Sequence, residues 1–345
     1  MEALSYSRQF RLDDHLEKLY RQAARPLAMK ATTIAAFNVW KAELRAAVLK
    51  LLGIAGRKRP RPAAQMLREI DCGKYVEQKW SLDVGEGAAA PMYLLVPKTP
   101  PPWKPILVVH GHNASAQTML GHSSDQKTRA ADLAIDDNYA QAPAEAGYFV
   151  CALEQRGFGE RLSRDVEPGG WTCTDRHMAF FLQMMGRTLI GERCHDAMCA
   201  IDYLLTRDDL VKGTLGMTGN SGGGTTTLWT AALDERIACP VTSCYLCSFK
   251  ASIMDITHCE CNYVPGIAAL CEMGDIAAMI APRAAMFIAG EKDTIFPIAA
   301  VREQFATVQK AYDLLKASDR CKLAVHEGPH AYKHAFAQEW FVKHL

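Results

Sequence analysis

Residues 214–233 read TLGMTGNSGGGTTTLWTAAL and place a serine between two predicted elements. The first part predicts a buried strand over 214–218, and the last part predicts a helix over 222–233. The turn between them, Gly219-Asn220-Ser221-Gly222-Gly223, has the G-x-S-x-G spacing in which a sharp strand-to-helix turn projects the serine hydroxyl above a sheet. Glycine costs about 1 kcal/mol relative to alanine inside a helix, so the glycines at 222–224 indicate close packing of helix on strand. We therefore expect Ser221 to be a nucleophile, with the amide of Gly222 facing an oxyanion.

The chain around this turn alternates between apolar runs and helical stretches. Runs typical of buried parallel strands occur at 106–109, 148–153, 214–218, 239–244, 284–289 and 322–325. Helical stretches intervene at 128–146, 188–206, 222–233, 298–317 and 335–345. This order predicts an α/β fold with a mainly parallel sheet that helices cover on both faces. Ligands of such sheets bind at the carboxyl ends of the strands, so the loops that follow the strands should carry the site.

The first 70 residues have a different pattern. Their apolar residues recur at spacings of three and four, which predicts an N-terminal helical extension over 1–70. From Tyr75 the pattern predicts two strands joined by a glycine-containing turn, and thus an antiparallel start to the sheet. We expect one catalytic domain over 71–345, with an insertion at about 245–280.

A serine nucleophile needs a histidine as general base and a carboxylate that holds the histidine in the useful tautomer. With a G-x-S-x-G turn, the chain order is serine, acid, histidine. Asp293 lies in the loop after the predicted strand AAMFIAG, whereas Glu291 still belongs to the end of that strand. His330 lies in the loop after the last predicted strand. Asp293 and His330 are therefore the expected acid and base.

Two other histidines lie close to His330 in the sequence. His334 begins the closing helix, and His326 lies on the last predicted strand itself. We expect both to have structural roles.

A second oxyanion donor is expected after the strand at 106–109, where the sequence continues His110-Gly111-His112-Asn113. A loop there can direct a backbone amide to the same point as the amide of Gly222. We assign this donor to His112, with Asn113 as the alternative. A metal site at His110 and His112 is the less favoured interpretation, because no carboxylate cluster lies nearby in sequence. We expect no metal and no organic cofactor.

Composition restricts the classes of partner. The 39 Lys and Arg residues almost balance the 38 Asp and Glu residues, so no global field favours nucleic acid or an acidic membrane surface. The composition of the short basic run Arg57–Arg61 predicts a solvated linker. The sequence shows no apolar signal core or membrane-spanning run, and many of its 12 cysteines lie in apolar segments. We expect a cytoplasmic protein with reduced thiols. The sequence is compatible with a homo-oligomer.

Several segments in order resemble the α/β-hydrolase superfamily, and within it the dienelactone-hydrolase-like and acetyl-xylan-esterase-like serine esterases. These segments are VVHGH, EQRGFGER, GRTLIGERCHDAMCAIDYL, GNSGGG, HCECNYVPG, APRAAMFIAGEKDTIFP and EGPHAY, within residues 75–345. The resemblance implies that Ser221, Asp293 and His330 carry catalysis, and that Arg156, Gly157 and Gly159 form a structural turn near the site. Dienelactone hydrolases proper use a cysteine nucleophile, so the serine favours ester hydrolysis.

Two further segments are candidate parts of the site. His258-Cys259-Glu260-Cys261 looks like a fragment of a zinc site but lacks a second ligand pair, so we expect it to shape the pocket wall. Trp171 and Met178–Met185 are candidates for lining an acyl or sugar pocket, with core packing as the alternative.

The function expected from the sequence is cleavage of a carboxylic ester through an acyl-enzyme on Ser221. The resemblance suggests a small-molecule or carbohydrate ester, with a short acyl group such as acetyl. A peptidase or thioesterase with the same triad remains an alternative, and so does a non-catalytic binding module of the same fold.

Overall fold

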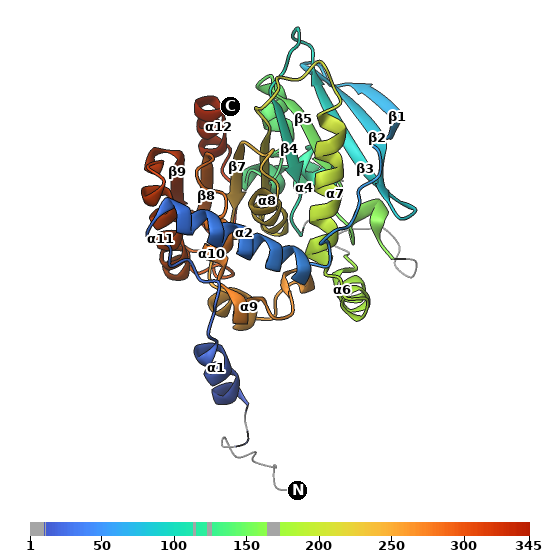
Figure 1. Cartoon of the computed structure of the whole chain (residues 1–345). Helices are drawn as coiled ribbons and strands as arrows, with labels where there is room; N and C mark the ends of the chain where they lie inside the picture. The colour runs from blue at the N-terminus through green and yellow to red at the C-terminus, as the bar shows by residue number, and fades with distance from the viewer. Residues whose placement is uncertain (1–9, 11, 113–114, 123–125, 164–172) are drawn as a thin grey trace, which may run out of the picture.

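The computed structural model describes residues 10, 12–112, 115–122, 126–163 and 173–345, and its centre is a twisted nine-stranded sheet (Figure 1). The spatial order of the strands is β1-β2-β3-β5-β4-β6-β7-β8-β9. Their bounds are β1 Ala64–Asp71, β2 Tyr75–Gly85, β3 Ala88–Pro97, β4 Pro105–Val109, β5 Phe149–Leu153, β6 Gly216–Asn220, β7 Cys239–Ser243, β8 Ala285–Gly290 and β9 Cys321–His326.

The sheet begins antiparallel and then becomes parallel. The pairs β1–β2, β2–β3 and β3–β5 are antiparallel, and every pair from β5 to β9 is parallel. After β4 the chain places β5 on one side and then crosses to place β6 on the other. The strand order therefore reverses between β4 and β6, which is the position where sheets of this kind bind ligands.

Helices cover both faces of the sheet. One face packs α2 Ile34–Leu51, α7 Leu189–Leu204, α8 Gly222–Leu233, α10 Met273–Ala278 and α11 Ile298–Leu314 in one apolar cluster. The other face packs α3 Ala116–Met119, α5 Gln141–Glu145 and α12 His334–His344 in a second cluster. The remaining helices are α1 Asp13–Gln22, α4 Gln126–Ala134, α6 Asp175–Met184 and α9 Ile267–Leu270, with short turns η2 Gly159–Arg161, η3 Lys250–Met254, η4 Glu260–Asn262 and η5 Ser318–Arg320. The predicted α/β fold with a doubly covered sheet is confirmed.

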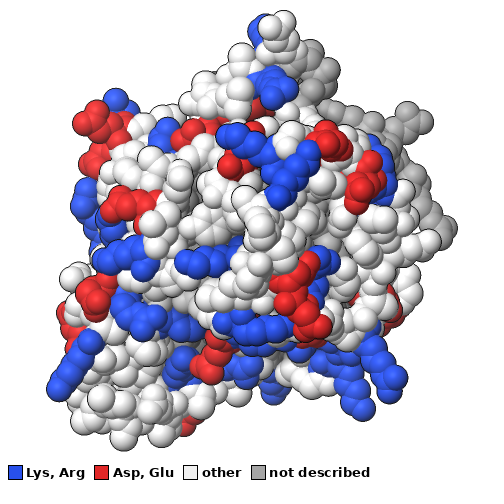
Figure 2. Space-filling view, turned by 90° about the horizontal axis from the view of Figure 1, so that it is seen from above, with Lys and Arg blue, Asp and Glu red and all other residues white. Residues whose placement is uncertain are grey.

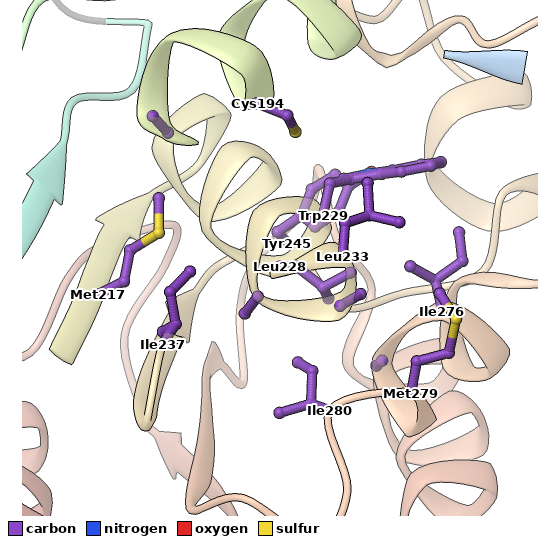
Figure 3. Packing of buried hydrophobic residues seen from close by; sticks show 14 of the residues in the cluster. Cys194, Met217, Leu228, Trp229, Leu233, Ile237, Tyr245, Ile276, Met279 and Ile280 are labelled. Atoms are coloured by element: carbon purple, nitrogen blue, oxygen red, sulfur yellow. The ribbon is translucent and has the colours of Figure 1, made fainter. Parts of the chain in front are cut away.

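Helix α8 lies at the centre of the larger cluster, and all of its residues are buried. Figure 3 shows Trp229, Leu228 and Leu233 of this helix among side chains from α7, α10 and β6. The indole of Trp229 donates a hydrogen bond to the hydroxyl of Tyr245 at 2.8 Å. The helix that follows Ser221 is thus fixed on every side, which gives the serine a rigid support.

The N-terminal region joins the same core. Phe37, Trp40, Leu44 and Val48 are the buried face of α2, and this helix runs across one face of the molecule (Figure 1). The sequence predicts residues 64–70 as part of the helical extension, but the structure places them in β1. Seven of the eight side chains of β1 are exposed, so the strand lacks the alternating pattern that would identify it and is held by pairing with β2.

The basic run Arg57–Arg61 is only partly the solvated linker that the sequence predicts: Lys58, Arg59 and Arg61 are exposed, but the side chain of Arg57 is 8% exposed. Arg57 pairs with the buried Glu192 at 2.6 Å, and Arg59 pairs with Asp202 at 2.5 Å.

On the face of the molecule shown in Figure 2, Lys and Arg are interspersed with Asp and Glu. Within the described part of the chain, no helix combines the length and apolar character needed to span a membrane.

Candidate active site

Ser221 occupies the turn between β6 and α8, as the sequence predicted. Its backbone has φ +57° and ψ −118°, a strained conformation for a residue with a side chain. The amide of Ser221 donates to the carbonyl of Ser243 at 3.0 Å, and its carbonyl accepts from the amide of Thr225 at 2.8 Å. The turn therefore holds the serine at the carboxyl end of β6, beside the reversal of strand order.

The glycines around Ser221 are required by close backbone approach. A Cβ atom on Gly223 would lie 2.1 Å from the carbonyl oxygen of Val109, and one on Gly224 would lie 2.3 Å from that of Ser243. On the facing loop, a Cβ on Gly111 would lie 2.7 Å from the carbonyl oxygen of Asn220. The predicted tight packing of helix on strand is confirmed.

Asp293 and His330 meet in a hydrogen bond, although 37 residues separate them. Nδ1 of His330 lies 2.8 Å from Oδ2 of Asp293. The other carboxylate oxygen accepts the amides of Ile295 and Phe296, at 2.8 and 3.1 Å. Burial opposes ionisation of Asp293, but the hydrogen bond and charge of His330 and the two amides outweigh it and lower the pKa of the carboxyl. The carboxylate is therefore ionised and fixes the orientation of the imidazole.

Ser221 and His330 line the same cavity, which has a volume of about 370 Å³. The cavity is also lined by His112, Ile135, Asp137, Asn220, Ile256, Thr257, His258, Cys259 and Ile295. Nε2 of His330 is buried and has no hydrogen-bond partner among the described residues. Unliganded sites often lack their catalytic hydrogen bond, which tightens when substrate binds.

His112 also lies beside Ser221, but its side chain has a role that the sequence did not predict. A Cβ on Gly222 would lie 2.6 Å from Nδ1 of His112, so the imidazole packs against the first residue of α8. Nε2 of His112 lies 2.8 Å from Oδ2 of Asp175. Asn113, the alternative donor to the oxyanion, lies outside the described residues. The backbone amides of Gly222 and His112 stay predicted oxyanion donors.

Asp175 connects His112 to a buried arginine. Its Oδ1 accepts from Nη2 of Arg193 at 2.5 Å, and both side chains are 1% exposed. Burial opposes ionisation of Asp175, but the charge of Arg193 and the hydrogen bond of His112 lower the pKa of the carboxyl to about 2. Gly157, with φ +92°, leaves room for this carboxylate, because a Cβ there would lie 2.7 Å from Oδ1. The turn at Arg156–Gly159 thus supports the wall of the site.

The alternative acids and bases lie elsewhere. Glu291 is exposed and pairs with Arg302 at 3.3 Å. His326 contacts the carbonyl of Ala331 at 3.2 Å, and His334 contacts Asn138 at 2.8 Å. These contacts agree with the structural roles expected for both histidines.

Two groups of three side chains place potential metal ligands within 4.8 Å of one another: His112, Asp175 and Cys261, and Cys244, Asp293 and His330. In each group the carboxylate already binds an imidazole, and Asp175 also binds Arg193. Burial raises the pKa of the Cys244 thiol to about 12, so this thiol is neutral beside Asp293.

His110 is the other histidine considered as a metal ligand. Its side chain is fully buried, and it accepts a hydrogen bond from the backbone amide of Gln155 at 3.0 Å.

The expectation that the segment at 258–261 shapes the pocket wall is confirmed, since His258 and Cys259 line the cavity. Met178–Met185 are not among the described residues that line it, and Met184 is 90% exposed. Trp171 lies outside the described residues. No sequence signal identifies Asp175, which belongs to no motif and is 63 residues from His112.

A strained serine at a strand-to-helix turn, an aspartate–histidine pair beside the same cavity and a sheet of this strand order define an α/β-hydrolase. The sequence model described as the Abhydrolase family matches residues 15–335. The chain therefore belongs to this family.

Individual proteins agree with this assignment. A protein of Bacillus subtilis (strain 168), named "Putative hydrolase YtaP", is 27% identical over 264 residues, which are 74% of this chain and 83% of that protein. A structure described as a "putative acetyl xylan esterase", from Bacteroides fragilis NCTC 9343, has a TM-score of 0.78 and 19% identity, and covers 94% of this chain and 85% of its own. A glucuronoyl esterase from Solibacter usitatus has a TM-score of 0.65 and 15% identity, over 92% and 96% of the two chains. At these identities the solved structures show a shared fold.

Proposed function

We propose that this protein is a serine esterase that cleaves carboxylic esters through an acyl-enzyme, with Ser221 as nucleophile, His330 as general base and Asp293 as orienting acid. The observation that carries the proposal is the 2.8 Å hydrogen bond between Asp293 and His330, beside a cavity that Ser221 also lines. The imidazole that Asp293 orients thus lines the same cavity as the serine.

The reaction follows from these positions. Asp293 accepts a hydrogen bond from Nδ1–H of His330, which leaves Nε2 free to take the proton of the Ser221 hydroxyl as the oxygen attacks the ester carbonyl. Backbone amides at Gly222 and His112 stabilise the tetrahedral oxyanion. Protonated His330 then gives its proton to the leaving alcohol, and a water molecule activated by the same imidazole releases the acyl group.

The substrate class is proposed from the likeness to carbohydrate esterases. The names of the solved structures include acetyl xylan esterases and glucuronoyl esterases, which favours an ester of a carbohydrate. The acetyl xylan esterases among them favour a short acyl group. The cavity of about 370 Å³ falls in the range of ordinary small-molecule sites. All 12 cysteines are unpaired, which supports the proposal of a reducing, cytoplasmic location.

The test is a substrate panel of nitrophenyl esters, acetylated sugars, thioesters and peptides, with wild type and Ser221→Ala. We expect short-chain esters to be turned over and the alanine variant to lose at least about a thousandfold in kcat. Preference for a thioester or peptide would move the assignment to the alternative hydrolases. Absence of turnover on every class would favour the non-catalytic binding module.

A further inference from the structure

His258 contributes a third imidazole to the cavity that holds Ser221 and His330. It comes from the segment after β7, between η3 and η4, and none of the proposed chemical steps uses it. Its ring packs edge-on against Phe296 at 5.4 Å between centroids, and Phe296 stacks on His330 at 5.7 Å. One aromatic side chain therefore contacts both histidines.

The hydrogen bonds of His258 determine where its proton resides. Nδ1 accepts the backbone amide of Cys259 at 2.9 Å, and Nδ2 of Asn262 lies 3.0 Å from the same atom. The Asn262 amide is buried, and the Cys259 carbonyl at 3.4 Å can only accept, so Nδ2 is the atom that faces the ring. Because Nδ1 accepts from N–H groups, the neutral ring carries its hydrogen on Nε2.

The ring is neutral at working pH. Burial, followed by the charges of His112 and His330, lowers the pKa of His258 to about 4. Near neutral pH, His258 therefore presents one N–H donor, and that donor is on Nε2.

This donor has no acceptor in the described part of the chain. Nε2 of His258 is buried and unpartnered, as is Nε2 of His330. A buried donor without an acceptor costs about 1–3 kcal/mol, so an unpartnered polar atom on a residue that lines a cavity requires an explanation, and a ligand that supplies the acceptor is one. For His330 the proposed chemistry supplies the partner. For His258 an acceptor on the substrate would do so.

We propose that the Nε2 hydrogen of His258 binds a hydroxyl or ring oxygen in the alcohol part of the substrate, and thereby selects polyhydroxylated alcohols. The proposal rests on the esterase function proposed above. The oxyanion already has predicted donors in two backbone amides, whereas the alcohol must leave next to His330, which protonates it. Phe296 contacts both His258 and His330, so His258 is near the imidazole that protonates the departing alcohol.

The experiment compares two acetate esters that differ in the hydroxyls of the alcohol: a mono-acetylated pyranoside and cyclohexyl acetate. The variants are His258→Asn, which keeps an acceptor near the Nδ1 position and removes the Nε2 donor, and His258→Gln, which places an amide N–H near the Nε2 position. The rate of deacetylation of the acyl-enzyme is measured from the linear phase that follows the burst with nitrophenyl acetate, since the nitrophenolate has then left. Thermal unfolding reports on folding.

We expect the wild type to favour the pyranoside, and His258→Asn to lower kcat/KM for it by about tenfold. The value for cyclohexyl acetate and the deacetylation rate should stay within about twofold of wild type, and His258→Gln should restore part of the loss. A structural role would instead lower all three rates together, and that result would overturn the proposal. The wild type tests it independently of the variants, because equal kcat/KM for the two esters would also overturn it. Absence of turnover on every ester would mean that the esterase function itself is wrong.

Discussion

Nδ1 of His330 lies 2.8 Å from Oδ2 of Asp293, and the second oxygen of the same carboxylate is held by the amides of Ile295 and Phe296. The carboxylate is thus fixed by its own loop before it fixes the imidazole. An imidazole held through Nδ1 leaves Nε2 available for chemistry, and this is the basis of the first prediction.

Replacement of Asp293 by asparagine should lower kcat by about ten-thousandfold, because the amide can stabilise the wrong tautomer of His330. The asparagine oxygen can still accept the loop amides, so the fold should be retained. Steady-state kinetics and circular dichroism measure the two effects. Glu291→Gln is the matched control in the same loop, since Glu291 is exposed and pairs only with Arg302 among the described residues. Equal losses in the two variants would exclude a specific role for Asp293.

The two neighbouring glycines after Ser221 should respond differently to alanine. In Gly223→Ala the new methyl group would lie 2.1 Å from a backbone oxygen that cannot move freely, so the free energy of unfolding should fall by about 1–3 kcal/mol or more. In Gly222→Ala the methyl group meets the side chain of His112 instead, so activity should fall more than stability. Chemical denaturation and ester hydrolysis, measured on both variants, separate these outcomes. A Gly223→Ala protein as stable as wild type would contradict the packing described.

The buried pair Asp175–Arg193 should make stability depend on acid pH. The folded pKa of Asp175 is about 2, below its ordinary value of about 3.9, so its contribution is present above pH 4 and is lost as the pH falls towards 2. Asp175→Asn should lower the free energy of unfolding at pH 7 by about 2 kcal/mol or more. Urea titrations at pH 7, 4 and 3 should show the gap to wild type shrinking at the lowest pH.

The control for this titration is Asp208→Asn, because Asp208 is fully exposed and lies 4.0 Å from Lys212. An exposed pair of this kind should contribute little. A gap between wild type and Asp175→Asn that stays constant with pH would show that the ionised carboxylate is not what stabilises the fold.

The sequence predicted the parallel strands and the turn at Ser221 because both have local patterns: short apolar runs and glycines where backbones touch. It predicted Asp293 and His330 from their places after successive strands. It could not identify β1, whose exposed side chains carry no alternation, or Asp175, whose partners His112 and Arg193 are brought to it only by tertiary packing. The residue types at 258–261 resemble part of a zinc site. The unpartnered Nε2 donor of His258, in contrast, can be identified only from the hydrogen bonds in the structure.

The central claim is that Ser221 is a nucleophile activated by His330. The most direct measurement is reaction of the folded protein with a fluorophosphonate, followed by peptide mapping by mass spectrometry. We expect one adduct on Ser221, no adduct at that site in Ser221→Ala, and much slower labelling in His330→Ala. An adduct on a different residue, or ester turnover by folded protein in which Ser221 stays unlabelled, would contradict the account.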